Sequence, residues 1–350
     1  MCWNKIAAGA VLALLASACG TSHAATDFKI VTAPEKDTYY AIGADLAKYV
    51  APAADINLDV VATSGSAANV RALRSDPGVR LAVMQADVYK AFADRAAAGN
   101  AEAASLIKPL RVILPLYATE AHYIVRADSE LNYLHEIKNA RINGGLVGSG
   151  AALITHTLYR LMFSAAMPDA NASFLSNEEA LVKLITDKSV DVVVVASGQP
   201  APLIANMKPE AQKFIKLLKF DPNHPSSKLV QGVYSPATIL ASSYPNLLTS
   251  DFTSVSVGSF LVTYDFSQKE IVDHMGKFAR SLCQNFATLQ AEGHPKWREV
   301  DLSLPNLGPG WSYYAPTARE IRACASSAAK LPAKGNKKCS AEEKILGLCS

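Results

Sequence analysis

Five short segments of the sequence combine hydroxyl, amide and glycine residues in a way that suits the binding of a small anion. Each follows an apolar run that predicts a strand and precedes a pattern that predicts a helix. The first N–H groups of a helix have no intrahelical partner and carry a partial positive charge, so small residues there leave them open to a carboxylate. The five segments are Thr38-Tyr39-Tyr40, Ser64-Gly65-Ser66, Gln85-Ala86-Asp87, Gly148-Ser149-Gly150 and Ser197-Gly198-Gln199-Pro200.

Taken singly, each segment has an ordinary explanation. Ser and Thr are common helix caps, the tyrosines can simply pack, and one Gly-Ser-Gly is weak evidence. The argument comes from their recurrence at one topological position, because ligands of open α/β sheets bind at the carboxyl ends of the strands. We therefore predict a cleft lined by hydrogen-bond donors that holds a small carboxylate without a metal ion. Lys36 lies near this cleft, where a lysine could help to hold an anion, but we interpret it as an exposed lysine.

The strands and helices that must position these segments alternate along the chain. Strands are predicted at 28–32, 56–62 and 79–87, and each is followed by a helical pattern. The helix after the first strand has Ile42, Leu46 and Val50 on one face. This alternation is typical of a mainly parallel sheet covered by helices.

A second α/β unit follows the first. Residues 111–128 contain two strand-like runs, and residues 140–163 read as a strand, a glycine-rich loop and a helix. Ser176 and Glu179 form a capping-box pattern before another helix, and an apolar strand ends at Ser197. Further on, 252–265 reads as strand and 268–291 as one long helix. We expect an α/β fold of two lobes joined by a hinge.

The chain shows no recognisable catalytic motif. It has no H-E-x-x-H, no G-x-S-x-G and no phosphate-binding loop. We interpret His122 and His156 as packed or surface residues and Glu178-Glu179 as a solvated helix start. Outside the N-terminal 24 residues and the lysine-rich end from Lys330, 28 basic residues face 29 acidic ones. We expect neither an enzyme, nor a cofactor, nor a nucleic-acid partner.

The N-terminal residues 1–24 have the pattern of a secretory signal peptide. Lys5 precedes an apolar run from Ile6 to Ala18, which is too short to span a bilayer. Ser22-His23-Ala24 suits ordinary cleavage, which we expect, and a lipid anchor on Cys19 is the alternative. Both readings place the mature protein in the periplasm.

Four cysteines remain after the leader, and an even number in an oxidising compartment suggests disulfides. Three pairings are possible. Only nine residues separate Cys339 from Cys349, so we expect this local pair and, with less support, Cys283 with Cys324.

The ordered motifs "TYYAIGADLAKYV", "VATSGSAANVRAL", "RLAVMQADV", "GLVGSGA", "DVVVVASGQPAPLI" and "LPNLGPGWSYYAPTAREI" resemble the TAXI family of solute-binding proteins of TRAP transporters. The resemblance covers about Phe28 to Arg322. It implies a type II periplasmic-binding-protein fold whose two lobes clamp a small organic acid, often an amino acid or a dicarboxylate, for a membrane permease.

The resemblance also implies ligand contacts. These fall on Thr38, Tyr39, Ser64, Gly65, Ser66, Gln85, Ser149 and Gly150, and we add their neighbours Tyr40, Asp87 and Gly148. Gln199, which we also include, stands where the family often has His. The segment "APEKD" replaces the family's glycine pair, and Ala86 and Ala151 replace hydroxyl residues.

The expected organisation is therefore a first lobe of 25–117 with 252–325, a second lobe of 118–251, and a C-terminal tail of 326–350. The hinge would lie near 116–122 and 252–261. We expect a monomer that serves a TRAP-type permease. A ligand sensor that signals to a membrane partner is the alternative, and a secreted enzyme on the same fold is a weaker one.

Overall fold

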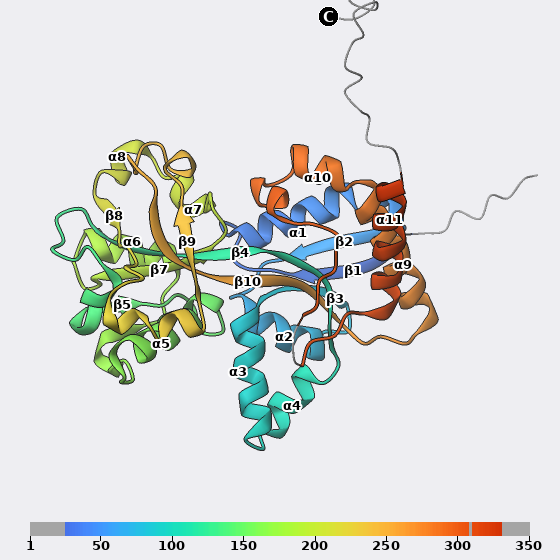
Figure 1. Ribbon diagram of the computed structural model, residues 1–350, viewed down its shortest axis with the longest axis horizontal. Helices are drawn as coiled ribbons and strands as arrows, with labels where there is room; N and C mark the ends of the chain where they lie inside the picture. The colour runs from blue at the N-terminus through green and yellow to red at the C-terminus, as the bar shows by residue number, and fades with distance from the viewer. Residues whose placement is uncertain (1–24, 308–309, 331–350) are drawn as a thin grey trace, which may run out of the picture.

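One ten-stranded sheet runs through the molecule (Figure 1). Its order is β2-β1-β3-β10-β4-β7-β5-β6, with β8 paired to β4 and β9 paired to β10. This computed structural model describes residues 25–307 and 310–330. The expected signal peptide 1–24, Cys19 and most of the tail lie outside the described residues.

The elements begin and end close to the predicted positions in most of the chain. The strands are β1 (Thr26–Val31), β2 (Ile56–Val61), β3 (Val79–Gln85), β4 (Leu110–Arg126), β5 (Ile142–Asn143), β6 (Ala172–Ser173), β7 (Val192–Ser197), β8 (Ile215–Leu217), β9 (Ser235–Ile239) and β10 (Phe252–Tyr264). The helices are α1 (Thr38–Tyr49), α2 (Ser66–Ser75), α3 (Ala86–Ala97), α4 (Ala101–Ile107), α5 (Gly150–Phe163), α6 (Asn177–Ile185), α7 (Pro202–Ala205), α8 (Pro209–Gln212), α9 (Lys269–Gln284), α10 (Phe286–Glu292) and α11 (Ala315–Lys330).

Two parallel groups of strands flank a central antiparallel pair. β1 pairs in parallel with β2 and β3, and β5 pairs in parallel with β6 and β7. Between the groups, β4 and β10 run antiparallel to each other along most of their length, from Leu110 opposite Tyr264 to Ala121 opposite Val255. The segment in which we predicted two strand-like runs is thus one strand of 17 residues.

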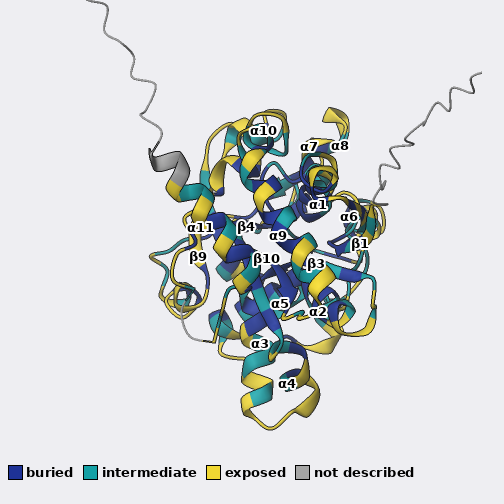
Figure 2. Ribbon diagram, turned by 90° about the vertical axis from the view of Figure 1, so that its right-hand side faces the viewer, coloured by how far each residue is buried: buried dark blue, intermediate teal, exposed yellow. Residues whose placement is uncertain are grey.

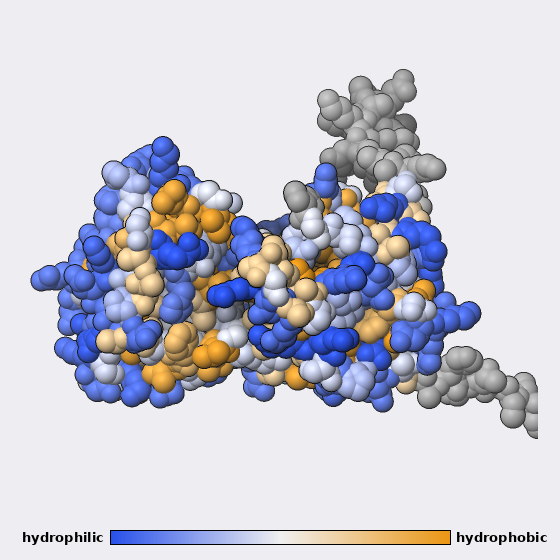
Figure 3. All heavy atoms as spheres, turned by 90° about the horizontal axis from the view of Figure 1, so that it is seen from below, coloured by the Kyte–Doolittle hydropathy of each residue, from blue (hydrophilic) through white to orange (hydrophobic). Residues whose placement is uncertain are grey.

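Helices cover both faces of each half of the sheet. In the half that contains β1–β3, one face packs against α1, α9 and α11 and the other against α2 and α3. In the half that contains β5–β7, α5 covers one face and α6 and α7 the other. Buried residues follow the sheet while exposed ones lie on the outer helix faces (Figure 2). This confirms the α/β class, and Figure 3 shows two masses joined at a narrower waist.

Two predictions about the last third of the described chain have opposite outcomes. The expected single long helix is wrong: it breaks at Asn285, which ends α9 and caps α10, and its side-chain amide donates to the Ser281 carbonyl at 3.0 Å. The pairing of Cys283 with Cys324 is confirmed, and it ties α9 to α11. Cys339 and Cys349 lie outside the described residues. Within 25–307 and 310–330, no helix has the length and apolar character that crossing a membrane requires.

Candidate ligand-binding site

A cavity of about 120 Å³ lies where the two halves of the sheet meet. One wall is formed by the loops that lead into α1, α2 and α3, and the other by the loops that lead into α5 and α6. The cavity is therefore at the carboxyl ends of strands from both halves, where the sequence predicts it. Of the predicted residues, the structure brings together Tyr39, Ser64, Gly65, Ser66, Gln85, Ser149 and Gly150.

Five predicted residues do not line this cavity: Thr38, Tyr40, Asp87, Gly148 and Gln199. Tyr40 is half-buried at the start of α1. The other four form contacts between elements of the protein.

Thr38 and Gly148 hold the two walls together. The Thr38 N–H donates to Ser197 Oγ at 3.1 Å, and its hydroxyl donates to the Gly198 carbonyl at 2.7 Å. The Gly148 carbonyl accepts from the N–H groups of Ala67 at 3.0 Å and Ala68 at 3.3 Å. The first turn of α2 therefore donates to the opposite wall. The sequence predicts that these two N–H groups are open to a carboxylate, and that prediction is wrong for Ala67 and Ala68.

Three other helix starts are capped from their own sequence. Asp37 accepts from the Tyr39 N–H at 2.8 Å, Ser149 from Ala152 at 3.0 Å, and Ser176 from Glu179 at 3.2 Å. These caps explain why α1, α5 and α6 begin where they do, since an N-cap oxygen satisfies one orphan donor of the first turn. The predicted cap at Ser176 is confirmed.

Charged groups on the cavity wall are mainly acidic. Asp37 lines the cavity, and burial raises its pKa to about 7, although the Tyr39 N–H and the Ser197 hydroxyl partly offset this. Lys36 and Glu178 also line it and face each other across the two walls, with Nζ 3.2 Å from a carboxylate oxygen. Their side chains are 64% and 44% exposed. Lys36 is thus exposed as expected, but it also forms the rim of the site.

Asp87 does not line the cavity, but it forms a further contact between the two halves. The Tyr234 hydroxyl donates to its Oδ2 at 3.0 Å, while its Oδ1 is buried without a partner. Burial raises the pKa of Asp87 to about 6, and the hydrogen bond from Tyr234 opposes that rise. A protonated carboxyl group would remove the cost of burying this charge.

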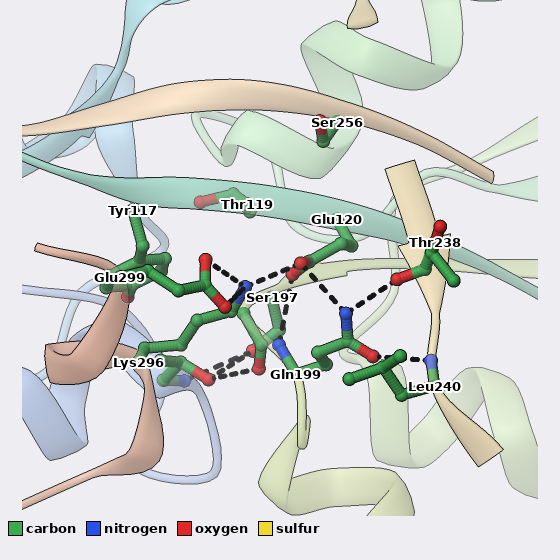
Figure 4. A network of polar contacts seen from close by, with 12 residues as sticks. Tyr117, Thr119, Glu120, Ser197, Gln199, Thr238, Leu240, Ser256, Lys296 and Glu299 are labelled. Atoms are coloured by element: carbon green, nitrogen blue, oxygen red, sulfur yellow. Dashed lines mark hydrogen bonds and ion pairs between the residues drawn. The ribbon is translucent and has the colours of Figure 1, made fainter. Parts of the chain in front are cut away.

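Gln199 belongs to a buried polar network rather than to the cavity (Figure 4). Its N–H and its amide donate to the Glu120 carboxylate at 3.0 and 3.1 Å, and the amide also donates to the Thr238 carbonyl at 2.8 Å. Its Oε1 accepts from the Leu240 N–H at 2.8 Å. Glu120 in turn contacts Lys296. The Gln199 side chain thus joins three segments and has its amide groups paired within the protein.

The family follows from the match of a family model. The model for the NMT1-like family matches residues 30–302, which contain the whole cavity wall. The chain belongs to the NMT1-like family.

Solved structures with similar folds are distant from this NMT1-like protein. The periplasmic binding protein BugD is 15% identical, with 87% of this chain and 96% of that chain covered and a TM-score of 0.49. PhnD1 from Prochlorococcus marinus, in complex with methylphosphonate, is 11% identical, with 87% and 99% covered and a TM-score of 0.47. The substrate-binding protein of an amino acid ABC transporter is 13% identical, with 77% and 99% covered and a TM-score of 0.44.

Several lining residues of the NMT1-like protein are missing from the sequence-based set. They are Asp37, Ser176, Asn177 and Glu178, together with the glycine-loop residues Gly145 and Leu146. The rule that selects the other helix starts applies to α6 as well, because its sequence predicts Ser176 as the cap. The strand before it, β6, has only two residues and therefore leaves no apolar run in the sequence that would mark this start as part of the site. Within the described residues no group of His, Cys, Asp or Glu side chains is arranged to hold a metal ion.

Proposed function

We propose that this NMT1-like protein is an extracytoplasmic solute-binding protein that captures a small organic ligand between two lobes. The observation that carries the proposal is the position of the cavity. It lies at the boundary between two separately packed halves and takes its lining from both. Ligand sites are commonly concave, few and located at domain interfaces.

Lobe closure is the functional event in this proposal. We assign 25–117 with 252–325 to one lobe and 118–251 to the other, with the hinge in the middle of β4 and β10. The contacts of Thr38 with Ser197, of Ala67 with Gly148, and of Lys36 with Glu178 all cross this boundary. These contacts exist only when the walls are close. A ligand that touches both walls binds this form better than an open one, and only such a difference shifts the population.

The delivery partner and the compartment are also part of the proposal. The motifs of the chain resemble the TAXI family, so we propose a periplasmic monomer that delivers its solute to a TRAP-type permease. The disulfide between Cys283 and Cys324 supports an oxidising compartment.

Recovery of a bound solute tests the proposed function. The protein is purified from its native host without denaturation, and mass spectrometry identifies any small molecule released on unfolding. We expect one organic solute at close to one per chain, and rebinding of that compound to stripped protein. If no small molecule is released, and calorimetry with organic acids and amino acids shows no heat of binding, the proposal is wrong. Small-angle scattering with and without solute then tests closure.

A further inference from the structure

A second cavity, of about 470 Å³, lies between α2, α3 and α4 of one half and α5 of the other. Figure 1 shows α3 and α4 projecting from the side of the sheet that α5 also covers. Among the described residues, only Ser149 lines both this cavity and the smaller one of the candidate site, which we call the solute cavity. Pockets that hold small molecules have volumes of about 300–1,000 Å³. The second cavity is therefore a separate space of a size that suits a small molecule.

Part of the wall of the second cavity is apolar and comes from both halves. Its lining includes Val88 and Phe92 of α3 and Leu153 of α5. Although Leu153 belongs to the other half, it packs against the hydrophobic cluster that contains Val88. Phe92 and Leu153 are only half-buried, so they keep apolar surface in contact with water. An apolar group that enters the cavity would remove such surface from water, which is favourable.

The charged groups of the lining leave one cation without a partner. Arg71 and Glu102 pair with each other. Arg95 is exposed and has neither an ion pair nor a hydrogen bond with the residues that the structure describes. Burial lowers the pKa of His156, the other basic residue of the lining, so its ring is neutral at pH 7. The lining therefore has a net charge of one positive unit, and the guanidinium of Arg95 can pair with an anion.

We propose that this cavity is a second binding site for a small amphipathic carboxylate, whose apolar chain lies against Phe92 and Leu153 and whose carboxylate pairs with Arg95. The planar guanidinium suits this head group because it can donate two parallel hydrogen bonds to a carboxylate. The site is separate from the solute cavity and goes beyond the proposed function. Its effect on closure rests on the proposed function: both halves supply the wall, so an occupant binds the closed form better and raises the affinity for the solute.

Three compounds test the chemistry of the second site. The protein is titrated by calorimetry with octanoate, with butyrate, which has the same head group on a shorter chain, and with octylammonium, which has the same chain and the opposite charge. Each CH₂ group that leaves water contributes about fourfold in affinity, equivalent to about 0.8 kcal/mol. We expect octanoate to bind at least tenfold more tightly than either of the others. Absence of octanoate binding, or equal binding of butyrate or octylammonium, overturns the second site while the proposed function stands.

Two pairs of variants locate the binding of octanoate. Ala91→Trp, at a half-buried lining position of α3, fills the cavity and should weaken binding at least tenfold, whereas Ala97→Trp, at an exposed position of the same helix outside the lining, should not. Arg95→Gln should weaken binding about threefold or more, because an ion pair at an exposed residue is modest. Arg74→Gln, an exposed arginine of α2 outside the lining, is its control. Unchanged affinity in either Ala91→Trp or Arg95→Gln overturns the assignment.

A variant of the solute cavity separates the two sites. Asn177 lines the solute cavity and not the second one, so Asn177→Trp should still bind octanoate. Loss of binding in this variant would place octanoate in the solute cavity and overturn the second site. In small-angle scattering, saturating octanoate should lower the radius of gyration of the wild type, and an unchanged radius with octanoate bound overturns the effect on closure. The release of a native solute, which tests the proposed function, does not depend on any of these outcomes.

Discussion

The ammonium nitrogen of Lys296 lies 2.5 Å from Oε1 of Glu120, and the two side chains are only 1% and 4% exposed. Glu120 is on β4 near the boundary between the halves, and Lys296 is on the short helix η7 (Pro295–Glu299). Lys296 also contacts Glu299 at 2.7 Å, and Glu120 accepts from Gln199 (Figure 4). Burial raises the pKa of Glu120, an effect that Lys296 partly offsets. The pair therefore fixes η7 and the loop after β7 to the centre of the sheet.

Lys296→Met should destabilise the protein strongly. The substitution leaves Glu120 buried without its cation, and breaking a buried pair costs about 3–5 kcal/mol. Chemical denaturation measures this loss. Lys269→Met removes an exposed pair with Asp273 and should change the free energy of unfolding by at most about 0.5 kcal/mol. If the two substitutions lowered the free energy of unfolding equally, the buried pair would contribute no more to stability than the exposed one.

Removal of the disulfide should lower stability through the unfolded chain. Cys283 and Cys324 are 41 residues apart. Closing a loop of that length stabilises the folded state by roughly 3–4 kcal/mol. The thermal midpoint of the wild type should fall on addition of a reductant. The double variant Cys283→Ala/Cys324→Ala should already have the lower thermal midpoint without reductant, and reductant should change it little. If reductant lowered the midpoint of the variant as much as that of the wild type, other cysteines would be responsible.

Asp87→Asn should change the pH dependence of stability. The pKa of Asp87 is about 6 in the folded protein against 3.8 for the ordinary group. The folded state holds this proton more tightly than the unfolded chain, so the contribution is present below about pH 4 and is lost as the pH rises through 6. As the pH rises from 4 to 7, the free energy of unfolding of the variant should increase relative to that of the wild type by on the order of 2–3 kcal/mol.

The difference between the two proteins is the quantity to measure, because other groups titrate in the same range. The pKa of Asp37 is raised to about 7 and that of His122 is lowered to about 4, both mainly by burial. These groups affect wild type and variant alike. Asp94→Asn, at an exposed position of the same helix α3, is the control. If the free energies of unfolding of Asp87→Asn and the wild type changed in parallel with pH, the pH dependence would not come from Asp87.

Gly65→Ala should weaken the closed arrangement. Gly65 has a φ of +125°, and a Cβ atom there would lie 3.2 Å from Ser149 Cα on the opposite wall. A non-glycine residue in this conformation costs about 1–3 kcal/mol, and a move that relieves the contact separates the walls. In small-angle scattering at a fixed solute concentration, the variant should have the larger radius of gyration. Gly232→Ala, where no atom lies within 4 Å, should match the wild type.

Local signals explain what could be predicted from the sequence. The helix starts at Thr38, Ser66 and Gly150 follow from an apolar run succeeded by small or capping residues, and both features lie within a few positions of each other. The predicted cavity residues come from these starts. Asn177 and Glu178 are absent from the predicted cavity residues because the two-residue strand before them has no readable pattern.

Long-range packing explains what could not be predicted. Lys296 is buried because Glu120 receives it, and these residues are 176 positions apart. Nothing in the sequence near Lys296 distinguishes it from an exposed lysine. Likewise, Pro115 predicts a break in the strand at the middle of β4, because proline has no N–H group to donate to a neighbouring strand. Pairing with β10 nevertheless carries the strand through, with a register shift between Gly258 and Phe260 opposite that position.

The pairing of β4 with β10 also constrains the order in which the chain can fold. Leu110 lies opposite Tyr264, and β3 reaches the rest of the sheet only through β10. While the polypeptide emerges from the ribosome, the first half therefore has an unfinished edge until more than 150 further residues have been made. Contacts between such distant segments form slowly, because the intervening chain must first be brought together. A chain that completes its first core this late spends longer after synthesis without its native long-range contacts, so its first strands stay open to other partners in that interval.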